Sequence, residues 1–248
     1  MDATVASRRR VRPSAEVTRA RILAAAVDLF AERSFDGAST RDIAARAEVS
    51  QPSLAYHFRT KDELWRAAVD SLFAELNATL GQRIEGLRGV DLLTTAKLVV
   101  RDFIGFSAAH PELHRIITQE TKGEGERIDW LVDTHVRPIY EITTAMFARL
   151  AEEGAVADVP PPFLYYLLTG AGPTIFVLAP ECRRLAGFDP QAPDHVKTHA
   201  DAVIELLFRE PDPRARLRDR VRRDLAGTDL VSDLVAERRR EAAAEDRP

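Results

Sequence analysis

The sequence predicts an all-α protein made of an N-terminal unit of three short helices and a larger helical C-terminal part. Apolar residues recur at the spacing of one helix face, and alternating strand patterns are nearly absent. Ser or Thr stands where each of the first four helices should begin, and such a side chain can accept from a free backbone N–H. Hydrophobic residues make up 45% of the 248 residues, so the chain can bury a sizeable core.

The first helix is expected to begin after Ser14, which is placed to cap it. Its inner face consists of apolar residues that recur every three to four positions: Ile22, Ala26, Leu29 and Phe30. Residues 35–37 (Phe-Asp-Gly) interrupt this pattern. We expect a turn there.

Two short helices should follow, and then a long one. Ser39 and Asp42 have the capping-box spacing, and Ser50 is placed to cap the next helix. A helix, a tight turn and a short helix make up the helix-turn-helix motif, whose second helix enters the major groove of DNA. Thr60 and Glu63 repeat the capping-box spacing and should open a long fourth helix.

Beyond residue 80, Gly and Pro residues separate further helical segments. By periodicity these lie at roughly 91–109, 111–121, 126–152, 161–179 and 192–209. Pro138 should kink the third of them. The Gly-Ala-Gly-Pro sequence at 170–173 should allow close helix packing, and we expect this at a dimer interface.

Charge is distributed unevenly along the chain. Residues 1–66 carry 12 Lys and Arg against 9 Asp and Glu, whereas the remainder carries 23 against 30. A mildly basic head on an acidic body fits a DNA-reading domain joined to a regulatory domain. We therefore expect four parts. They are a basic flexible arm (1–13), a helix-turn-helix DNA-binding domain (14–60), a helical ligand-binding and dimerisation domain (61–210) and a charged C-terminal tail (211–248).

The outward face of the expected third helix carries groups that suit DNA. Gln51 can pair bidentately with adenine, and Ser53 can bond to a base or a phosphate. Other polar groups are suited to phosphates, which position a protein without reading sequence: Tyr56, His57 and Lys61. This face differs from the Lys and Glu mixture of a merely solvated helix.

Residues from Thr18 to Leu64 resemble the tetracycline-repressor (TetR/AcrR) family of transcriptional regulators. The resemblance rests on TRARILAAAVDLFAER from Thr18, STRDIAARAEVSQPSLAYHF from Ser39, and KDEL from Lys61. It implies a homodimer with a DNA-binding head and a ligand-binding body whose last two large helices form a four-helix dimer interface. The family's DNA contacts fall here on Thr40, Arg41, Ser50, Gln51, Ser53, Tyr56, His57 and Lys61.

Three positions depart from the family pattern. Ser34 and Glu48 stand where the family usually has Gly, and Ala55 stands where an aromatic residue is common. A left-handed conformation at Glu48 would cost about 1–2 kcal/mol. None of the three removes a core residue, so they bear on operator preference and not on the fold.

The C-terminal part offers aromatic and polar side chains for a concave ligand site. Our candidate contacts are Phe103, Phe106, Trp130, His135, Phe147 and Tyr166. The alternative for most of these aromatic residues is a place in the core. Histidines four apart, at His110 and His114 and at His195 and His199, would need further ligands to hold zinc. We therefore expect no metal and no cofactor.

The expected function is ligand-responsive transcriptional regulation. The protein should act as a repressor that binds a palindromic operator in double-stranded DNA as a dimer and is released by a small molecule. An inducer-independent DNA-binding protein and an activator remain the alternatives. An enzyme is not expected, because the sequence shows no activated nucleophile motif, phosphate loop or metal-ligand cluster.

The sequence also predicts a cytoplasmic protein that does not span a membrane. Cys182 is the single cysteine, so no intramolecular disulfide can form. The basic residues of 1–13 are not followed by an apolar stretch, as a secretory signal would require. Pro173 and Pro180 bound the apolar run near Phe176 too closely for the ~20 residues of a membrane span.

Overall fold

The computed structural model describes residues 14–210, and the expected arm (1–13) and tail (211–248) lie outside the described residues. The described part consists of helices joined by short loops, with one isolated antiparallel bridge between Val156 and Phe208 and no strand. The predicted all-α class is therefore confirmed.

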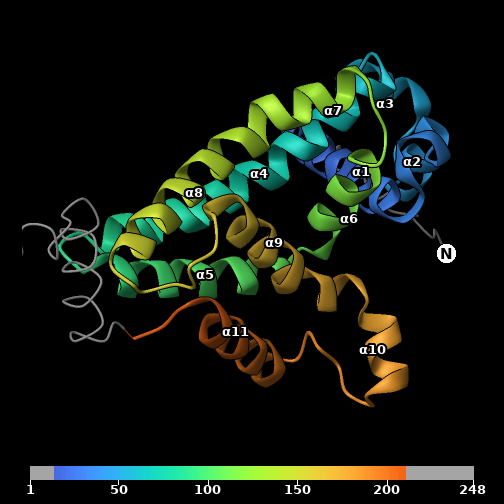
Figure 1. Ribbon diagram of the computed structural model, residues 1–248. Helices are drawn as coiled ribbons and strands as arrows, with labels where there is room; N and C mark the ends of the chain where they lie inside the picture. The colour runs from blue at the N-terminus through green and yellow to red at the C-terminus, as the bar shows by residue number, and fades with distance from the viewer. Residues whose placement is uncertain (1–13, 211–248) are drawn as a thin grey trace, which may run out of the picture.

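Three helices form the head at one end of the molecule (Figure 1). They are α1 (Ala15–Gly37), α2 (Thr40–Arg46) and α3 (Gln51–His57). The long helix α4 (Lys61–Gly86) begins next to α3 and runs into the body. It thus connects the head to the rest of the protein.

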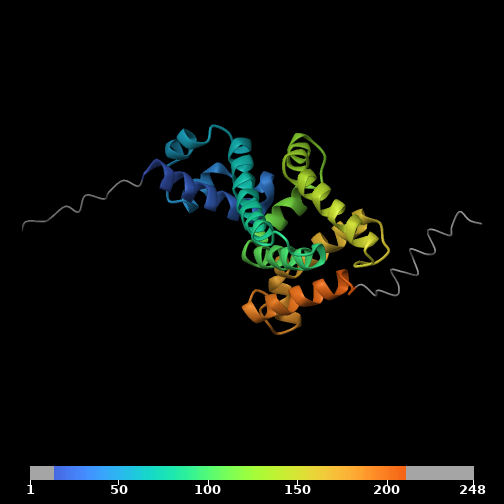
Figure 2. The ribbon, with the colours of Figure 1, turned by 90° about the vertical axis from the view of Figure 1, so that its left-hand side faces the viewer.

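The body follows in chain order along α5 (Leu92–Ala109), α6 (Pro111–Glu120), α7 (Glu126–Leu131), the π-helical turn η1 (Val132–Val136), α8 (Arg137–Glu152), α9 (Pro161–Val177), α10 (Ala179–Leu185) and α11 (Pro193–Leu207). Helix α5 is central and packs against α4, α9 and α11. Figure 2 shows α11 lying beneath α5.

All four predicted N-caps are confirmed. In each, a hydroxyl accepts from the backbone N–H three residues later: Ser14 from Val17 at 3.3 Å, Ser39 from Asp42 at 3.1 Å, Ser50 from Ser53 at 3.3 Å, and Thr60 from Glu63 at 3.0 Å. These bonds satisfy amides that have no intrahelical partner. They explain why short helices such as α2 and α3 begin where the sequence predicts.

The predicted single helix at 126–152 is divided by a π-helical turn. The turn spans Val132–Val136 and closes with a bond from the Arg137 N–H to the Val132 carbonyl. Pro138 follows directly, lacks an N–H, and would clash with the carbonyl four residues earlier in a regular helix. Widening the preceding turn relieves that clash, so the predicted kink takes this form.

Three further details differ from expectation. The break in the first helix is at Ser34, and residues 35–37 form a last helical turn after it. Helix α10 was not predicted, although Pro180 in its first turn is a common start signal. Gly172 is buried against Phe103 of α5, where an added Cβ would lie 3.4 Å from the ring. The close packing at Gly172 is therefore within the chain, and packing of residues 170–173 at a dimer interface stays a prediction.

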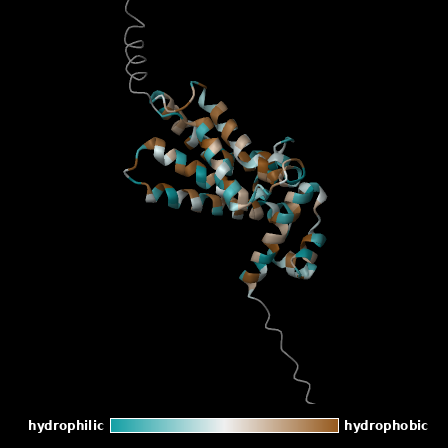
Figure 3. Cartoon of the chain, turned by 90° about the horizontal axis from the view of Figure 1, so that it is seen from below, coloured by the Kyte–Doolittle hydropathy of each residue, from teal (hydrophilic) through white to brown (hydrophobic). Residues whose placement is uncertain are grey.

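Buried side chains form two clusters. The first joins the inner faces of α1–α3 to α4, α6 and α7, and the second holds α5, α8, α9 and α11 together. Figure 3 shows hydrophobic and hydrophilic residues alternating along the long helices, as such packing requires. The division expected between residues 60 and 61 stays a prediction, and the first cluster lies on both sides of it.

No single helix within residues 14–210 is long and apolar enough to cross a membrane. Helices α9 and α10 meet the length and composition criteria only when taken together, and they are bent by 70° relative to each other.

Candidate nucleic-acid interface and effector pocket

Helix α3 buries one face and exposes the other. Leu54 and Phe58 are 2% and 3% exposed, because they pack into the first core cluster. Gln51 and Ala55 are exposed, and Tyr56 is 82% exposed. A ring this exposed contributes little to the stability of the core. It is available for contact with a partner.

The turn between α2 and α3 is held from α1. Arg21 donates through Nη2 to the Ala47 carbonyl at 2.6 Å and pairs with the Glu48 carboxylate at 3.1 Å. Glu48 has φ 52°, the left-handed conformation that its position in the tight turn demands. The backbone strain expected from a non-glycine residue is therefore present, and the pair with Arg21 offsets part of it.

Most cationic side chains of the described head are already engaged. Four pair with carboxylates: Arg21 with Glu48, Arg33 with Asp42, Arg46 with Glu32, and Arg66 with Asp62. Arg46 lowers the pKa of Glu32 through their hydrogen bond. Two others lie over rings, Arg19 over Phe58 and Lys61 over Phe35. Among residues 14–66, only Arg41 and Arg59 have neither kind of partner.

Arg41 and Arg59 are both exposed and flank α3. Arg41 lies in the first turn of α2, and Arg59 lies in the turn between α3 and α4. Free guanidinium groups beside an exposed recognition face suit phosphate oxygens. The sequence pointed to Arg41 but not to Arg59. Arg59 stands out only because the structure shows that most neighbouring cations already have partners.

The other predicted DNA contacts belong to α2, α3 with its cap, and the start of α4. Ser50 caps α3, and its hydroxyl accepts from Ser53. His57 is half-buried, with its ring 5.2 Å from that of Tyr56 in an edge-to-face arrangement. Thr40 begins α2, and the Lys61 ammonium lies 4.4 Å above the Phe35 ring. Contact of these residues with DNA stays a prediction.

Phe35 and two tryptophans connect the head to the body. The Phe35 ring lies under the Lys61 ammonium and, at 3.8 Å, under the Arg127 guanidinium of α7. Trp65 of α4 meets Trp130 of α7 with ring centroids 5.6 Å apart. Movement of α7 relative to α4 would therefore disturb contacts close to α3.

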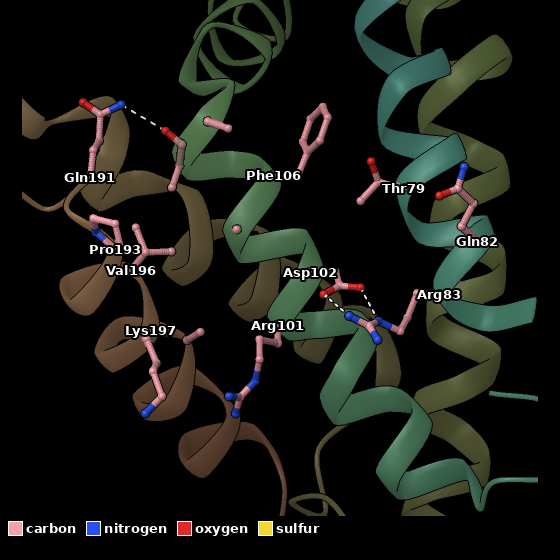
Figure 4. Close-up of a pocket in the computed structure, with 14 residues that line it drawn as sticks. Thr79, Gln82, Arg83, Arg101, Asp102, Phe106, Gln191, Pro193, Val196 and Lys197 are labelled. Atoms are coloured by element: carbon pink, nitrogen blue, oxygen red, sulfur yellow. Dashed lines mark hydrogen bonds and ion pairs between the residues drawn. The ribbon is translucent and has the colours of Figure 1, made fainter. Parts of the chain in front are cut away.

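An open pocket of about 950 Å³ lies between α4, α5 and α11 (Figure 4). We call it the α4–α5–α11 groove. Its lining is Thr79, Gln82 and Arg83 from α4; Arg101, Asp102, Gly105, Phe106, Ala108 and Ala109 from α5; Gln191 from the loop before α11; and Pro193, Val196, Lys197 and Ala200 from α11. This volume lies within the range of small-molecule sites.

Only Phe106 of the six predicted ligand contacts lines this groove. Phe147 is completely buried in the second core cluster, and Tyr166 is 68% exposed on α9. Trp130 and His135 lie at the junction with α4, where the His135 Nε2 is 2.8 Å from an Asp70 carboxylate oxygen. Phe103 packs against both core clusters. The structure does not bring the six together, and ligand contact stays a prediction for each.

Three of the four paired histidines bond to backbone carbonyls or stack on a ring. His199 donates through Nε2 to the Gly172 carbonyl at 2.9 Å, and His195 donates through Nδ1 to the Asp189 carbonyl at 2.7 Å. His110 stacks on Phe106 with centroids 4.5 Å apart. Among residues 14–210, no group of three or more His, Cys, Asp or Glu is arranged to hold a metal ion.

Comparison with known proteins matches the head to one family model. Residues 22–68 match the model described as bacterial regulatory proteins, tetR family, which spans α2, α3 and the adjoining parts of α1 and α4. Residues 22–68 therefore form a TetR-family domain. The resemblance expected from the sequence is thus confirmed, and the helix-turn-helix described above is the DNA-binding domain that defines this family.

Relatives extend the comparison beyond the head. The HTH-type transcriptional repressor Rv3405c of Mycobacterium tuberculosis is 45% identical over 73 residues, which are 29% of this chain and 39% of the relative. The match thus spans about two fifths of the relative's length. The HTH-type transcriptional repressor SCO4008 of Streptomyces coelicolor is 27% identical over 206 residues, covering 77% of this chain and 96% of the relative.

A solved structure has the same fold. AibR, crystallised in complex with isovaleryl coenzyme A and operator DNA, aligns with a TM-score of 0.62 over 77% of this chain and 98% of its own. Identity is 18%, so the likeness concerns the arrangement of helices.

Proposed function

We propose that the protein is a homodimeric, ligand-responsive transcriptional repressor of the cytoplasm, without enzymatic activity, that binds a palindromic operator through α3. The observation that carries this proposal is the exposed face of α3. Gln51 and Tyr56 project from a short helix that is capped by Ser50 and anchored by Leu54 and Phe58. Such a helix fits the major groove, and Gln51 is placed to read an adenine.

Dimerisation is supported by the outer face of α9. This helix carries no Asp, Glu, Lys or Arg, and it exposes Phe163, Tyr166 and Leu167 by 63%, 68% and 54%. Leu206 of the neighbouring α11 is 78% exposed. A second copy would cover these apolar side chains, and the dimer would present two copies of α3 to the two halves of an operator.

Ligand response is supported by the groove beside α4, since α4 also carries Lys61 and Trp65 at the head. A small molecule can shift the dimer between two geometries only by its difference in affinity for them. The structural neighbour AibR was solved with both isovaleryl coenzyme A and operator DNA, the kind of pairing that we propose here. An inducer-independent DNA-binding protein or an activator would share the same head.

Selection from random duplex DNA tests the proposal. Purified protein should enrich an inverted repeat, and footprinting should show protection of both half-sites. Enrichment of a single half-site would contradict the dimeric arrangement, and recovery of no sequence above background would contradict sequence-specific binding. The position of the enriched site relative to a promoter then separates a repressor from an activator.

A further inference from the structure

The α4–α5–α11 groove has a charged part and an apolar part. Figure 4 shows Arg83, Arg101 and Lys197 in one half of the view and Phe106 in the other. Apolar side chains, including Val196 and Pro193, line much of the remainder. A ligand that fills the groove would therefore carry an anionic group at one end and hydrocarbon at the other.

The cationic part keeps a net positive charge after its internal pairs are counted. Arg83 forms a bidentate pair with Asp102, at 2.5 Å and 3.0 Å. Arg101 and Lys197 share one carboxylate, that of Asp201, at 2.5 Å and 3.4 Å. Three cations thus face two carboxylates. Such a site favours a single additional negative charge.

Arg101 retains unused donor capacity. Asp201 accepts from one of its terminal nitrogens, and the Arg101 Nε is buried without a hydrogen-bond partner among the described residues. A guanidinium has five N–H donors in a planar fork that matches a carboxylate. A ligand carboxylate that re-orients Arg101 would use donors that protein groups leave unused.

Gly105 is the second observation that points to a ligand. It lies in the middle of α5 and lines the groove, and an added Cβ would meet nothing within 4 Å. Glycine inside a helix costs about 0.5–1 kcal/mol relative to alanine. Since neither packing nor a positive φ requires glycine here, its visible effect is to leave space in the groove beside α5.

We propose that the α4–α5–α11 groove binds an amphipathic monoanion, a carboxylate on an unbranched aliphatic chain, and that this ligand is the effector. The carboxylate lies against Arg101 and Lys197, and the chain lies along Gly105 toward Phe106. The regulatory half of this proposal rests on the function proposed above. The binding half does not, because it concerns the groove alone.

The groove is positioned to act on the head through α4. Thr79, Gln82 and Arg83 belong to the same helix as Lys61 and Trp65. A ligand that binds both this end of α4 and the α5–α11 pair favours one separation between them. The other end of α4 then moves relative to α7, where Trp65 meets Trp130.

Direct titration of the full-length protein tests the binding half. Binding of three probes is measured by calorimetry in the absence of DNA. The probes are decanoate, acetate and decyltrimethylammonium. Decanoate should bind, while acetate lacks the chain and decyltrimethylammonium has the wrong charge. Equal affinity for decanoate and decyltrimethylammonium would overturn the assignment of the cationic half.

Two variants locate the site, each with a matched control. Arg101→Gln removes the proposed carboxylate contact. Arg137→Gln is its control, because Arg137 is also partly exposed and pairs with one carboxylate, that of Asp133, outside the groove. Gly105→Leu fills the groove, and Gly81→Leu is its control, since Gly81 also has open space around its Cβ position and lies outside the lining.

Arg101→Gln and Gly105→Leu should each weaken decanoate binding about tenfold or more, while both controls stay within about twofold of the wild type. Leucine favours helix over glycine, so far-UV circular dichroism should show Gly105→Leu folded. Unchanged decanoate affinity in folded Gly105→Leu would overturn the site.

Measuring DNA binding with and without decanoate separates the proposed effector role from the proposed function. Decanoate should release the wild type from its selected DNA and leave the Gly105→Leu complex intact. If decanoate binds the groove and DNA affinity does not change, the effector role is overturned and the binding site stands. If the protein binds no DNA sequence, the proposed function fails, and the calorimetry still decides the groove.

Discussion

Trp65 of α4 and Trp130 of α7 meet at 62° with their ring centroids 5.6 Å apart, and they are the only tryptophans in the chain. Arg66 lies 4.9 Å above the Trp130 ring. The contact joins the head end of α4 to the body. Intrinsic fluorescence therefore reports on this junction between α4 and α7.

Removing one ring should weaken this junction. Trp130→Ala should lower the free energy of unfolding by about 2 kcal/mol, because Trp130 is half-buried and loses its contact with Trp65. The measurement is urea denaturation followed by far-UV circular dichroism. Trp130→Phe keeps an aromatic contact and should cost less than half as much. An unchanged urea midpoint in Trp130→Ala would show that the contact contributes nothing to stability.

Ser34 has an unfavourable backbone conformation at the break in α1. Its φ of 62° and ψ of 175° lie in a region that glycine alone adopts readily. Ser34→Gly should raise the free energy of unfolding by about 1 kcal/mol, measured by urea denaturation. Ser34→Ala is the control and should bring no gain, since alanine has the same Cβ.

Glu48→Gly should stabilise the protein less than Ser34→Gly. It relieves a φ of 52°, but it also removes the ion pair with Arg21, which at this exposure is worth up to about 0.5 kcal/mol. A larger gain at Glu48 than at Ser34 would contradict this ranking of strain.

A charge on the outer face of α9 should prevent dimerisation. Leu167→Glu places a carboxylate among Phe163 and Tyr166, where burial against a second copy would be costly. Analytical ultracentrifugation should show a dimer for the wild type and a monomer for Leu167→Glu. Ile142→Glu is the control: Ile142 is similarly exposed, at 70%, but belongs to α8, and its replacement should leave the dimer intact.

His114 should make stability depend on pH. Burial lowers the pKa of His114 from the ordinary value of 6.5, so the folded state binds a proton less readily than the unfolded state. Its contribution is complete above pH 6.5 and is lost as pH falls from there toward the folded-state pKa. The urea midpoint should be lower at about pH 5.5 than at about pH 7.5, and His114→Gln should reduce that difference. An equal drop in His114→Gln would assign the effect to other groups.

Local signals in the sequence explain what could be predicted of the fold. Ser14, Ser39, Ser50 and Thr60 cap helices because capping depends on residues three apart. The recognition face follows from the same short-range geometry. The π-helical turn escaped prediction because a kink at Pro138 can be relieved in several ways.

The groove could not be predicted, for a different reason. Its lining comes from Thr79, Arg101 and Lys197, on three helices that only tertiary packing brings together. Aromatic composition pointed instead to Phe147, which packing buries completely. Arg59 was missed because it differs from the neighbouring cations only in lacking a partner. Those partners are tertiary contacts that the sequence does not show.

The affinity for selected DNA at several salt concentrations tests the central claim, that the edge formed by α3 and the following turn contacts the duplex. We compare the wild type with the triple variant Gln51→Ala, Tyr56→Ala, Arg59→Ala. All three side chains are exposed, so thermal unfolding should be unchanged. The variant should bind about a hundredfold more weakly, with a slope of log affinity against log salt shallower by about one. Wild-type affinity and slope in the folded variant would contradict the account.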